Sequence, residues 1–405
     1  MHIETGSRRL LGLLMVLVLL SFGAPAFALP GDAFVVDRWQ GGRGRVLRVN
    51  PMDGGQRVVT AGGKFVDPWG VAVEQDGDLV VADQGAFGGL GGVLRIDPAT
   101  GTMEEVSRGG NFVAPTGIAV ESDGDIVVSD PAAGGGTGAL IRVDPLTEQQ
   151  AVLSQGQLFN NPRGVTVGAN GDLLVADEHA FGGRGGVIRV NPLTGLQSEV
   201  SSGAPFLNPL GIARARNGEL IVSDEGPTNN PGAGAVYAVD PGTGNKRLIS
   251  SGGRFNMVGM VSVERDGDIL GAVQDGLRNN SGGVVWVDPP SGSQTVLSTG
   301  GSFTDPVGIA LAAGQRRVRC SGQNADRIAT NGPNQVTGTS GADVIASLGG
   351  PDTVRAGGGN DRVCGGPSND ILNGGPGRDT LVGGPGRDRC IGGPGPDRLI
   401  RCERR

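Results

Sequence analysis

The C-terminal part of the chain repeats with a period of nine residues. From Gly338 to Ile400 an aspartate returns at every ninth position without a slip, at Asp343, Asp352, Asp361, Asp370, Asp379, Asp388 and Asp397. A glycine-rich turn precedes each aspartate, and an apolar residue or cysteine follows two positions after it. Such GGxGxDxUx repeats predict a parallel β-roll in which the turns offer oxygen ligands to calcium and the U positions fill a thin core.

The period also predicts where the aspartates lie. Each nine-residue unit forms half a coil, so aspartates 18 residues apart share an edge. One row then holds Asp343, Asp361, Asp379 and Asp397, and the other holds Asp352, Asp370 and Asp388. Ca²⁺ takes about 6–8 oxygen ligands, and backbone carbonyls approach an ion closely where a turn lacks side chains. We therefore predict all seven aspartates as calcium ligands, with at most one ion between each pair of row neighbours.

This repeat resembles the hemolysin-type (RTX) calcium-binding repeats over residues 338–400, and the resemblance implies calcium as the cofactor. The match has faults: Ser368 replaces a turn glycine, residues 347–350 read Ser-Leu-Gly-Gly, and Pro396 stiffens the last turn. Residues 338–405 carry nine arginines against eight carboxylates, so self-repulsion without calcium is weaker than in a strongly acidic repeat. The alternative is a degenerate glycine-rich roll that binds few ions weakly.

The N-terminus has the features of a secretory signal peptide over residues 1–28. Arg8 and Arg9 precede an apolar run from Leu10 to Phe22, and Ala26-Phe27-Ala28 offers a cleavage site. The apolar run is too short to span a membrane. We therefore expect a secreted, extracellular protein with no transmembrane segment after signal cleavage. The net charge of −7, without a basic patch in the sequence, argues against a nucleic-acid partner.

Four cysteines lie in the C-terminal quarter of the chain, at Cys320, Cys364, Cys390 and Cys402. An even number in an exported chain favours disulfides, and none has the CxxC spacing of a zinc site. Four cysteines allow three pairings, of which Cys320–Cys364 with Cys390–Cys402 is the most local. Cys390 occupies a U position, so we expect its sulfur to be buried. Reactive thiols are the alternative.

Residues 33–312 repeat with a longer period of 47 to 49 residues. The clearest mark is a Pro-x-Gly-(Ile/Val)-Ala phrase, whose glycine falls at positions 70, 117, 164, 211, 259 and 308. Each unit continues through an Asp-Gly or Asn-Gly turn into two apolar strands and one polar strand, such as Leu79 to Ala82, Val93 to Asp97 and Met103 to Ser107. Four short strands per unit with hairpin turns predict the blades of a β-propeller.

The ends of this region give the number of blades. Residues 33–60 contain only the second to fourth strands of a unit, and Pro306 to Leu311 supplies only a first strand. The two ends therefore complete one shared blade. The predicted fold class is all-β, with a six-bladed β-propeller over residues 29–312, a linker over 313–337 and a C-terminal parallel β-roll with disulfides over 338–405. Asn334 is a candidate for the start of a decayed nonapeptide turn.

The longer repeat resembles NHL-type propellers and, more loosely, the streptogramin-lyase and gluconolactonase groups. This resemblance indicates fold far better than function. We expect an unknown ligand or extracellular partner at the face that carries the loops between second and third strands. An aspartate ends the second strand in five units, at Asp37, Asp83, Asp130, Asp177 and Asp224. We expect each to accept backbone hydrogen bonds from its own loop; a cation-binding ring is the alternative.

Residues that break the blade symmetry are better candidates for function. His179 is the only histidine after the signal peptide, and it lies beside Glu178. Streptogramin-lyase-type enzymes use propeller-face histidines with a divalent metal, so the resemblance makes His179 and Glu178 candidates for a general base and its neighbour. The lack of a histidine cluster favours a solvated loop histidine instead. Trp39, Trp69 and Arg163 are further asymmetric candidates for ligand contact.

Two functional hypotheses follow from the sequence. In the first, the protein is a secreted calcium-binding protein whose propeller is a non-enzymatic scaffold for a ligand or partner. In the second, it is a lyase or lactone hydrolase with a site near His179. The sequence contains no Gly-x-Ser-x-Gly elbow, HExxH motif or phosphate loop, which favours the first. A third hypothesis is a cell-surface adhesion module, which retention at the envelope after chelation would distinguish.

Overall fold

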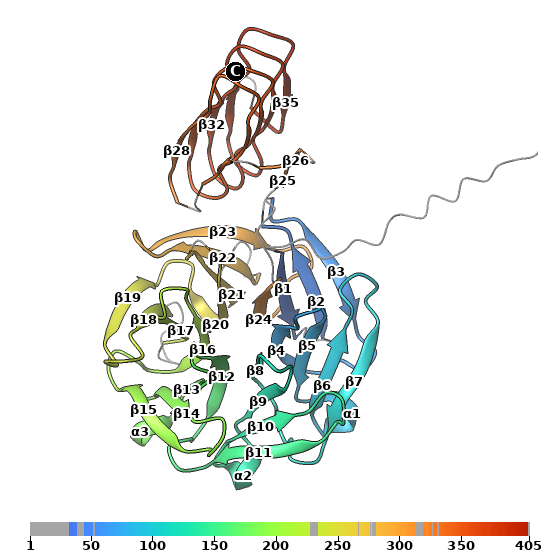
Figure 1. Cartoon of the computed structure of the whole chain (residues 1–405), viewed down its shortest axis with the longest axis vertical. Coiled ribbons are helices and arrows are strands. Elements are labelled where there is room, and N and C mark those ends of the chain that lie inside the picture. Colours follow the sequence, from blue (N-terminus) through green and yellow to red (C-terminus); the bar gives the residue numbers. More distant parts are fainter. Residues whose placement is uncertain are drawn as a thin grey trace, which may run out of the picture.

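The computed structural model describes residues 32–38, 44–51, 53–226, 234–265, 267–275, 277, 281–312, 319–321, 323–325, 327–329 and 332–403. The predicted signal peptide and Trp39 lie outside these residues. As the sequence predicts, the described chain is nearly all β. It forms a ring of six four-stranded sheets and a C-terminal parallel β-solenoid beside the ring (Figure 1).

Each sheet of the ring is an antiparallel blade, with its first strand innermost. From first to sixth, the blades are β24 (Pro306–Leu311), β1 (Ala33–Asp37), β2 (Arg45–Val49) and β3 (Gln56–Ala61); β4 (Pro68–Val73), β5 (Leu79–Asp83), β6 (Gly92–Ile96) and β7 (Met103–Arg108); β8 (Ile118–Val120), β9 (Ile126–Asp130), β10 (Ala139–Val143) and β11 (Gln150–Gln155); β12 (Pro162–Val167), β13 (Leu173–Asp177), β14 (Gly186–Val190) and β15 (Gln197–Ser202); β16 (Pro209–Arg214), β17 (Leu220–Asp224), β18 (Ala235–Val239) and β19 (Lys246–Ser251); and β20 (Asn256–Val263), β21 (Ile269–Asp275), β22 (Gly283–Asp288) and β23 (Ser293–Thr299).

The two ends of the propeller sequence close the ring within the first blade. β24 pairs antiparallel with β1, and the register places Val35 opposite Ile309. This pairing confirms the shared blade that the incomplete terminal units predicted. β3 also bonds back to the sixth blade, because the Gln56 side chain donates to Ser298 Oγ at 3.0 Å and to Gly300 O at 3.1 Å.

The glycine of the Pro-x-Gly phrase is needed for the innermost strands to fit around the central channel. A Cβ on Gly70 would collide with the carbonyl oxygen of Thr116 in the next blade, and a Cβ on Gly308 would collide with that of Trp69. The glycines at positions 117, 164 and 259 meet a carbonyl oxygen of the following blade in the same way, and the glycine at position 211 meets the backbone of Met260. The innermost strands therefore touch all round the ring, which makes the channel narrow at this level.

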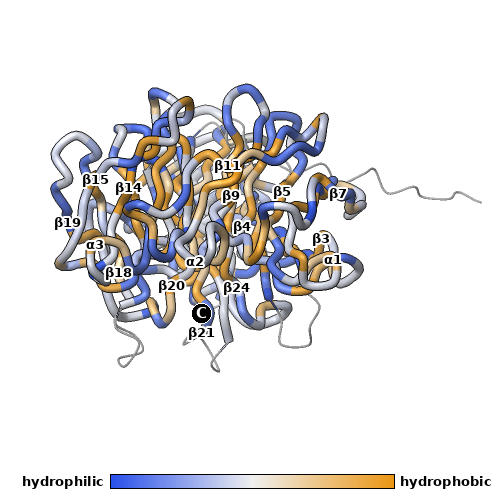
Figure 2. Tube along the Cα trace, turned by 90° about the horizontal axis from the view of Figure 1, so that it is seen from below, coloured by the Kyte–Doolittle hydropathy of each residue, from blue (hydrophilic) through white to orange (hydrophobic). Residues whose placement is uncertain are grey.

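Apolar side chains fill the spaces between blades. Every residue of β5, β9 and β13 is buried, because each sheet packs against a neighbour on both faces. Hydrophilic residues lie in the turns and loops at the two ends of the ring and on the outer strands, such as β7 and β15 (Figure 2). A glutamine that begins the fourth strand also joins neighbouring blades: Gln150 donates to Ser107 Oγ at 2.9 Å and to Gly109 O at 3.0 Å.

Among the described residues, three loops between second and third strands contain a tight four-residue turn that the sequence did not predict. These turns are α1 (Ala86–Gly89), α2 (Ala133–Gly136) and α3 (Ala180–Gly183). Each includes residues with positive φ, among them Phe87 at 55° and Phe181 at 53°. None of the helices among the described residues has the length and apolar character that a bilayer crossing demands.

The C-terminal solenoid consists of two parallel sheets joined by the glycine-rich turns. One sheet contains β27 (Arg327–Ile328), β29 (Val344–Ala346), β31 (Arg362–Cys364), β33 (Thr380–Val382) and β35 (Arg398–Ile400); the other contains β28 (Gln335–Thr337), β30 (Thr353–Arg355), β32 (Ile371–Asn373) and β34 (Arg389–Ile391). The U positions from Ile345 to Leu381 are fully buried between them. Cys390 is only partly buried and Leu399 is 47% exposed. Burial of Cys390 was therefore overestimated, because it lies near the open end of the core.

The solenoid begins earlier in the chain than the first complete repeat. β27 and β28 fall within residues 313–337, the segment assigned to a linker, and pair with β29 and β30. Asn334 stands 18 residues before Asp352, and its N–H donates to Asp352 Oδ1 at 2.8 Å. A decayed repeat thus still supplies β pairing, so the linker is shorter than expected.

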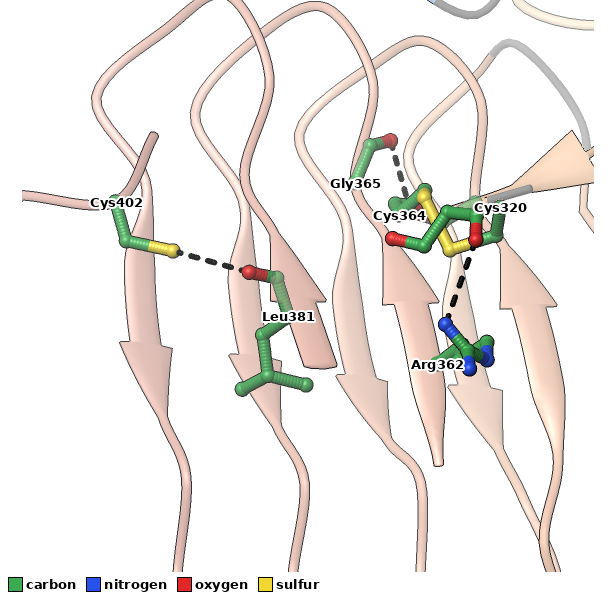
Figure 3. The surroundings of a disulfide bond; sticks show 8 residues. Cys320, Arg362, Cys364, Gly365, Leu381 and Cys402 are labelled. Carbon is green, nitrogen blue, oxygen red and sulfur yellow. Dashed lines mark hydrogen bonds between the residues drawn. A yellow bond between two sulfur atoms is a disulfide. The ribbon is translucent and has the colours of Figure 1, made fainter. Parts of the chain in front are cut away.

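Two disulfides fasten the solenoid, with the pairing that is most local in the sequence. Cys320, on β25 (Arg319–Cys320), bonds to Cys364, while Cys390 bonds to Cys402. β25 forms a small hairpin with β26 (Gln323–Asn324). Figure 3 shows the Cys320–Cys364 bond against β31 and the side chain of Arg362, which donates to the carbonyl oxygen of Ser321 at 3.4 Å.

Candidate calcium site and propeller face

The repeated aspartates form two hydrogen-bonded ladders along the edges of the solenoid. The Oδ1 atom of each aspartate from Asp361 to Asp397 accepts the backbone N–H of the aspartate 18 residues earlier, at 2.8–2.9 Å. The two rows expected from the nine-residue spacing are therefore present. Each hydrogen bond of the ladder uses Oδ1 and does not involve the second carboxylate oxygen, Oδ2.

Several of these second oxygens are buried and have no hydrogen-bond donor. They are the Oδ2 atoms of Asp352, Asp370, Asp379 and Asp388. The first glycine of the turn lies directly beside the oxygen: a Cβ on Gly374 would collide with Asp379 Oδ2, and one on Gly383 with Asp388 Oδ2. The glycine therefore keeps open the space beside a carboxylate oxygen that the protein itself leaves unsatisfied.

Burial makes the charged form of these carboxylates unfavourable in the metal-free chain. Burial raises the pKa of Asp370 to about 9, and the charges of Asp352 and Asp388 add to this effect. Burial also raises the pKa of Asp352 to about 7. A nearby cation would reverse these shifts, and hard oxygen donors beside glycine-rich backbone are what calcium prefers. The residues present therefore fit calcium.

Asp343 differs from the aspartates in the middle of the rows. Its Oδ2 accepts hydrogen bonds from Thr339 N at 2.6 Å and Thr339 Oγ1 at 2.8 Å, and Arg327 Nε lies 3.4 Å from Oδ1. Burial alone would raise the pKa of Asp343, but these contacts lower it overall. Asp343 is thus already satisfied by the protein.

Two departures from the repeat change backbone strain and leave the register intact. Leu348 and Ser368 stand at turn positions where other repeats have glycine, and they adopt φ angles of 69° and 118°. These values lie in the region that favours glycine. The turns therefore stack in the same way as their neighbours, at a cost in local strain.

On the propeller, the aspartate that ends the second strand has the structural role expected of it. Asp83 accepts four backbone hydrogen bonds at 2.9 Å, from Gly85 and Ala86 in its own loop and from Val66 and Asp67 before β4. The pattern recurs at Asp130, and in part at Asp37, Asp177 and Asp224. These carboxylates are used to hold two loops together.

His179 and Glu178 do not bond to each other. The His179 side chain is exposed, and its Nδ1 lies 3.3 Å from Asn161 Nδ2. Glu178 is buried, with Arg163 Nε at 3.2 Å and a hydrogen bond from the Asn161 amide. The structure therefore separates the pair that the sequence joined: Glu178 faces Arg163, and His179 faces solvent.

Trp69 and Arg163 meet across the mouth of the channel. Trp69 belongs to the second blade and Arg163 to the fourth, yet the guanidinium carbon lies 5.2 Å from the centre of the indole ring. Arg38, from the first blade, lies 4.1 Å from the same ring. The sequence did not single out Arg38, which directly follows the repeated aspartate Asp37 at a position where the blades differ. That variation within an otherwise regular repeat was the available signal.

A separate group of three carboxylates lies at the turn between β8 and β9. Glu121, Asp123 and Asp125 bring oxygens within 4.8 Å of one another. Arg142 donates two hydrogen bonds to Glu121, at 2.6 and 2.8 Å, and lies 3.7 Å from Asp125. The arginine offsets much of the negative charge, which explains the group without an ion.

Comparison with known proteins identifies two repeat types. Residues 337–372 and 365–399 match the RTX calcium-binding nonapeptide repeat, and residues 159–181 match the NHL repeat. No curated protein matches the chain. Among solved structures, a chain in the crystal structure of a nidogen/laminin complex is 15% identical with a TM-score of 0.54, covering 70% of this chain and 98% of that chain. TolB from Acinetobacter baumannii is 13% identical with a TM-score of 0.55, covering 70% and 66% respectively.

At these identities the solved structures indicate fold alone. Together with the geometry, the matches define a six-bladed propeller with an NHL repeat, followed by RTX repeats in a parallel β-solenoid. The RTX repeats indicate calcium binding. The disulfides and these repeats are consistent with an extracellular location.

Proposed function

We propose that this is a secreted protein in which calcium stabilises the C-terminal roll and the propeller is a non-enzymatic scaffold that binds a ligand or extracellular partner. The observation that carries the calcium role is the set of buried carboxylate oxygens that have no donor, which at Asp370, Asp379 and Asp388 lie beside the first glycine of the turn. Leaving such atoms unsatisfied is costly, and a divalent cation would remove that cost.

The six aspartates that follow Asp343 are the proposed ligands. Asp352, Asp370 and Asp388 would hold ions along one edge, and Asp361, Asp379 and Asp397 along the other, together with carbonyl oxygens of the turns. Bound calcium would offset the cost of burying the charged form, which raises the pKa values of Asp352, Asp370, Asp379 and Asp388. Asp343 is the weakest candidate of the seven because Thr339 and Arg327 already occupy its oxygens.

Secretion is supported by residues 1–28 and by the cysteines. The N-terminal sequence has the charge, apolar run and cleavage site of a signal peptide. The chain has two disulfides. Cysteines in the cytosol are kept reduced, whereas disulfides persist in oxidising compartments, so both disulfides favour an exported protein. Calcium outside the cell is abundant enough to fill sites of modest affinity.

The lyase or lactone-hydrolase alternative has less support. It requires a base near the channel, whereas the His179 side chain is exposed and Glu178 is engaged by Arg163 and Asn161. His179→Ala is expected to leave the fold intact. A lactonase or lyase activity that disappears in this variant, while the melting curve stays unchanged, would favour the alternative.

Melting curves of the mature chain test the calcium role. We expect millimolar calcium, but not equimolar magnesium, to raise the unfolding temperature relative to chelator, because calcium binds the folded roll. Mg²⁺ is smaller than Ca²⁺, requires near-octahedral coordination and usually keeps several bound waters, so it should not replace calcium in these turns. No shift at millimolar calcium would overturn the proposed role of the roll.

A further inference from the structure

The repeat of the propeller loses an ion pair in the fifth blade. In the second blade Arg95, on the third strand, donates two hydrogen bonds to Glu74, directly after the first strand, at 2.6 and 2.7 Å. The third blade has the same pair. In the fifth blade the equivalent residues are Ala238, fourth in β18 as Arg95 is fourth in β6, and Ala215, directly after β16. The fifth blade therefore lacks two long side chains at this place.

A hollow of about 430 Å³ lies here, between the fifth and sixth blades. Its floor is formed by Ala215, Ile221 and Ile249, which all belong to the apolar core between these blades. Pockets for small molecules are mostly apolar clefts of about 300–1,000 Å³ with a few polar groups that fix the orientation of the ligand. The hollow has the size and the floor of such a site.

Two arginines at the rim of the hollow have no acceptor of their own. Arg216 and Arg265 come from the turns between first and second strands of the fifth and sixth blades, and both are exposed. Among the described residues, neither guanidinium has a hydrogen-bond acceptor or an ion-pair partner. A third arginine, Arg247, lies 3.3 and 3.4 Å from the two carboxylate oxygens of Glu219. The rim therefore offers two guanidiniums, one from each blade, beside an apolar floor.

The carboxylates of the rim are engaged, in contrast to these two arginines. Glu219 accepts a hydrogen bond from Asn217 Nδ2 at 2.7 Å, and Asp288 accepts one from Ser291 Oγ at 2.5 Å. Asp268 is buried and also has a partner. An incoming cation would compete with these contacts, whereas an anion would displace nothing at Arg216 or Arg265. Three carboxylates around the hollow would repel a doubly charged anion more strongly than a singly charged one.

We propose that this hollow binds a small apolar monocarboxylate, with its apolar body on the floor and its carboxylate at Arg216 and Arg265. The planar guanidinium fork matches a carboxylate in geometry and charge. In an antiparallel blade the turns that form the hollow lie at the opposite end from the loops between second and third strands. The sequence placed a ligand or partner at those loops, so this inference goes beyond the proposed function and is independent of it.

Calorimetric titration of the mature chain at low ionic strength tests the inference. The probes are phenylacetate and hexanoate, with phenylacetamide as the neutral comparison. We expect both carboxylates to bind, and phenylacetamide to bind about tenfold more weakly or less, because it lacks the charge. Arg216→Gln with Arg265→Gln should weaken carboxylate binding by a similar factor. Arg57→Gln with Arg355→Gln removes two exposed arginines that do not line the hollow and should change nothing.

A second double variant tests the hollow without touching the arginines. Ala215→Glu with Ala238→Arg introduces the pair that occupies this place in the second and third blades, and should abolish binding of both carboxylates. Melting curves establish that each variant is folded. If this variant does not fold, the arginine variant alone decides.

Three results would overturn the inference. The first is equal phenylacetate affinity in the Arg216/Arg265 variant and in its Arg57/Arg355 control. The second is retained binding in a folded Ala215/Ala238 variant. The third is a chain that binds neither carboxylate at millimolar concentration, or binds phenylacetamide as tightly as phenylacetate. None of these results bears on calcium in the roll or on a partner at the other end of the ring.

Discussion

Replacing Asp379 with asparagine should have opposite consequences with and without calcium. The Asp379 side chain accepts one hydrogen bond, from Asp361 N at 2.9 Å, through Oδ1, and its buried Oδ2 has none. Asparagine keeps the Oδ1 acceptor and removes a charge whose burial raises the pKa of Asp379. In chelator we therefore expect the free energy of unfolding to change by less than about 1 kcal/mol, because no hydrogen bond is lost.

In calcium the same substitution should be costly. Extracellular calcium modules have dissociation constants of about 10⁻⁴–10⁻³ M, so 10 mM free calcium stabilises the roll by about 1.4–2.7 kcal/mol per site. Asp379 lies between Asp361 and Asp397 in its row and can therefore serve two ions. Loss of both would remove about 3–5 kcal/mol of calcium-induced stability.

Asp343→Asn is the matched control. It breaks the contact with Arg327, whose side chain is 42% exposed, and should cost about 1 kcal/mol or less in both conditions. The calcium increment should be unchanged. Calorimetric unfolding of the three proteins in chelator and in 10 mM calcium measures all four differences. Equal calcium increments for the Asp379 and Asp343 variants would refute shared ions within a row.

Three other substitutions or conditions give expected outcomes. In chelator, the stability of the roll should fall as the pH rises between about 4 and about 9, because the raised pKa values of Asp352 and Asp370 mean that the folded roll holds protons more tightly than the unfolded chain. With saturating calcium, which requires ionised carboxylates, this dependence on pH should weaken or reverse. A stability that does not change with pH in chelator would contradict the prediction. Ser368→Gly should stabilise the roll by about 1 kcal/mol with or without calcium, because it relieves a φ of 118°; a loss of stability would show that the serine makes compensating contacts. Gln150→Ala should lower the stability of the propeller by about 1–3 kcal/mol, because it removes the hydrogen bonds that Gln150 makes with Ser107, Gly109 and Asn111. Gln155→Ala is the control, because Gln155 is exposed and its loss should not change stability. Equal unfolding temperatures of the two variants would exclude a role of Gln150 in joining blades.

Features that follow from a fixed period were predictable from the sequence. The unbroken nine-residue spacing predicted which aspartates share an edge, and the ladder from Asp343 to Asp397 follows that order. The incomplete units at the two ends of the propeller predicted the pairing of β1 with β24. In both cases each repeat contacts its equivalent in the next, so sequence spacing determines spatial neighbours.

Contacts between unequal positions were not predictable in this way. Gln150 reaches Ser107, which is 43 residues earlier, and nothing in the spacing shows that the fourth strands of adjacent blades meet there. Arg163 reaches Trp69 across the channel from a blade that is not its neighbour. The partial exposure of Cys390 depends on where the core ends, and the decayed repeat at Asn334 was visible only as a single matching residue.

The position of bound calcium tests the central claim most directly. Crystals of the mature protein grown with calcium would show the ions by their anomalous scattering. We expect ions in the turns between Asp361 and Asp379 and between Asp370 and Asp388, against the Oδ2 atoms of those rows. Calcium found only elsewhere, such as at Glu121, Asp123 and Asp125, or turns without bound ions at millimolar calcium, would contradict the proposed role of the repeats.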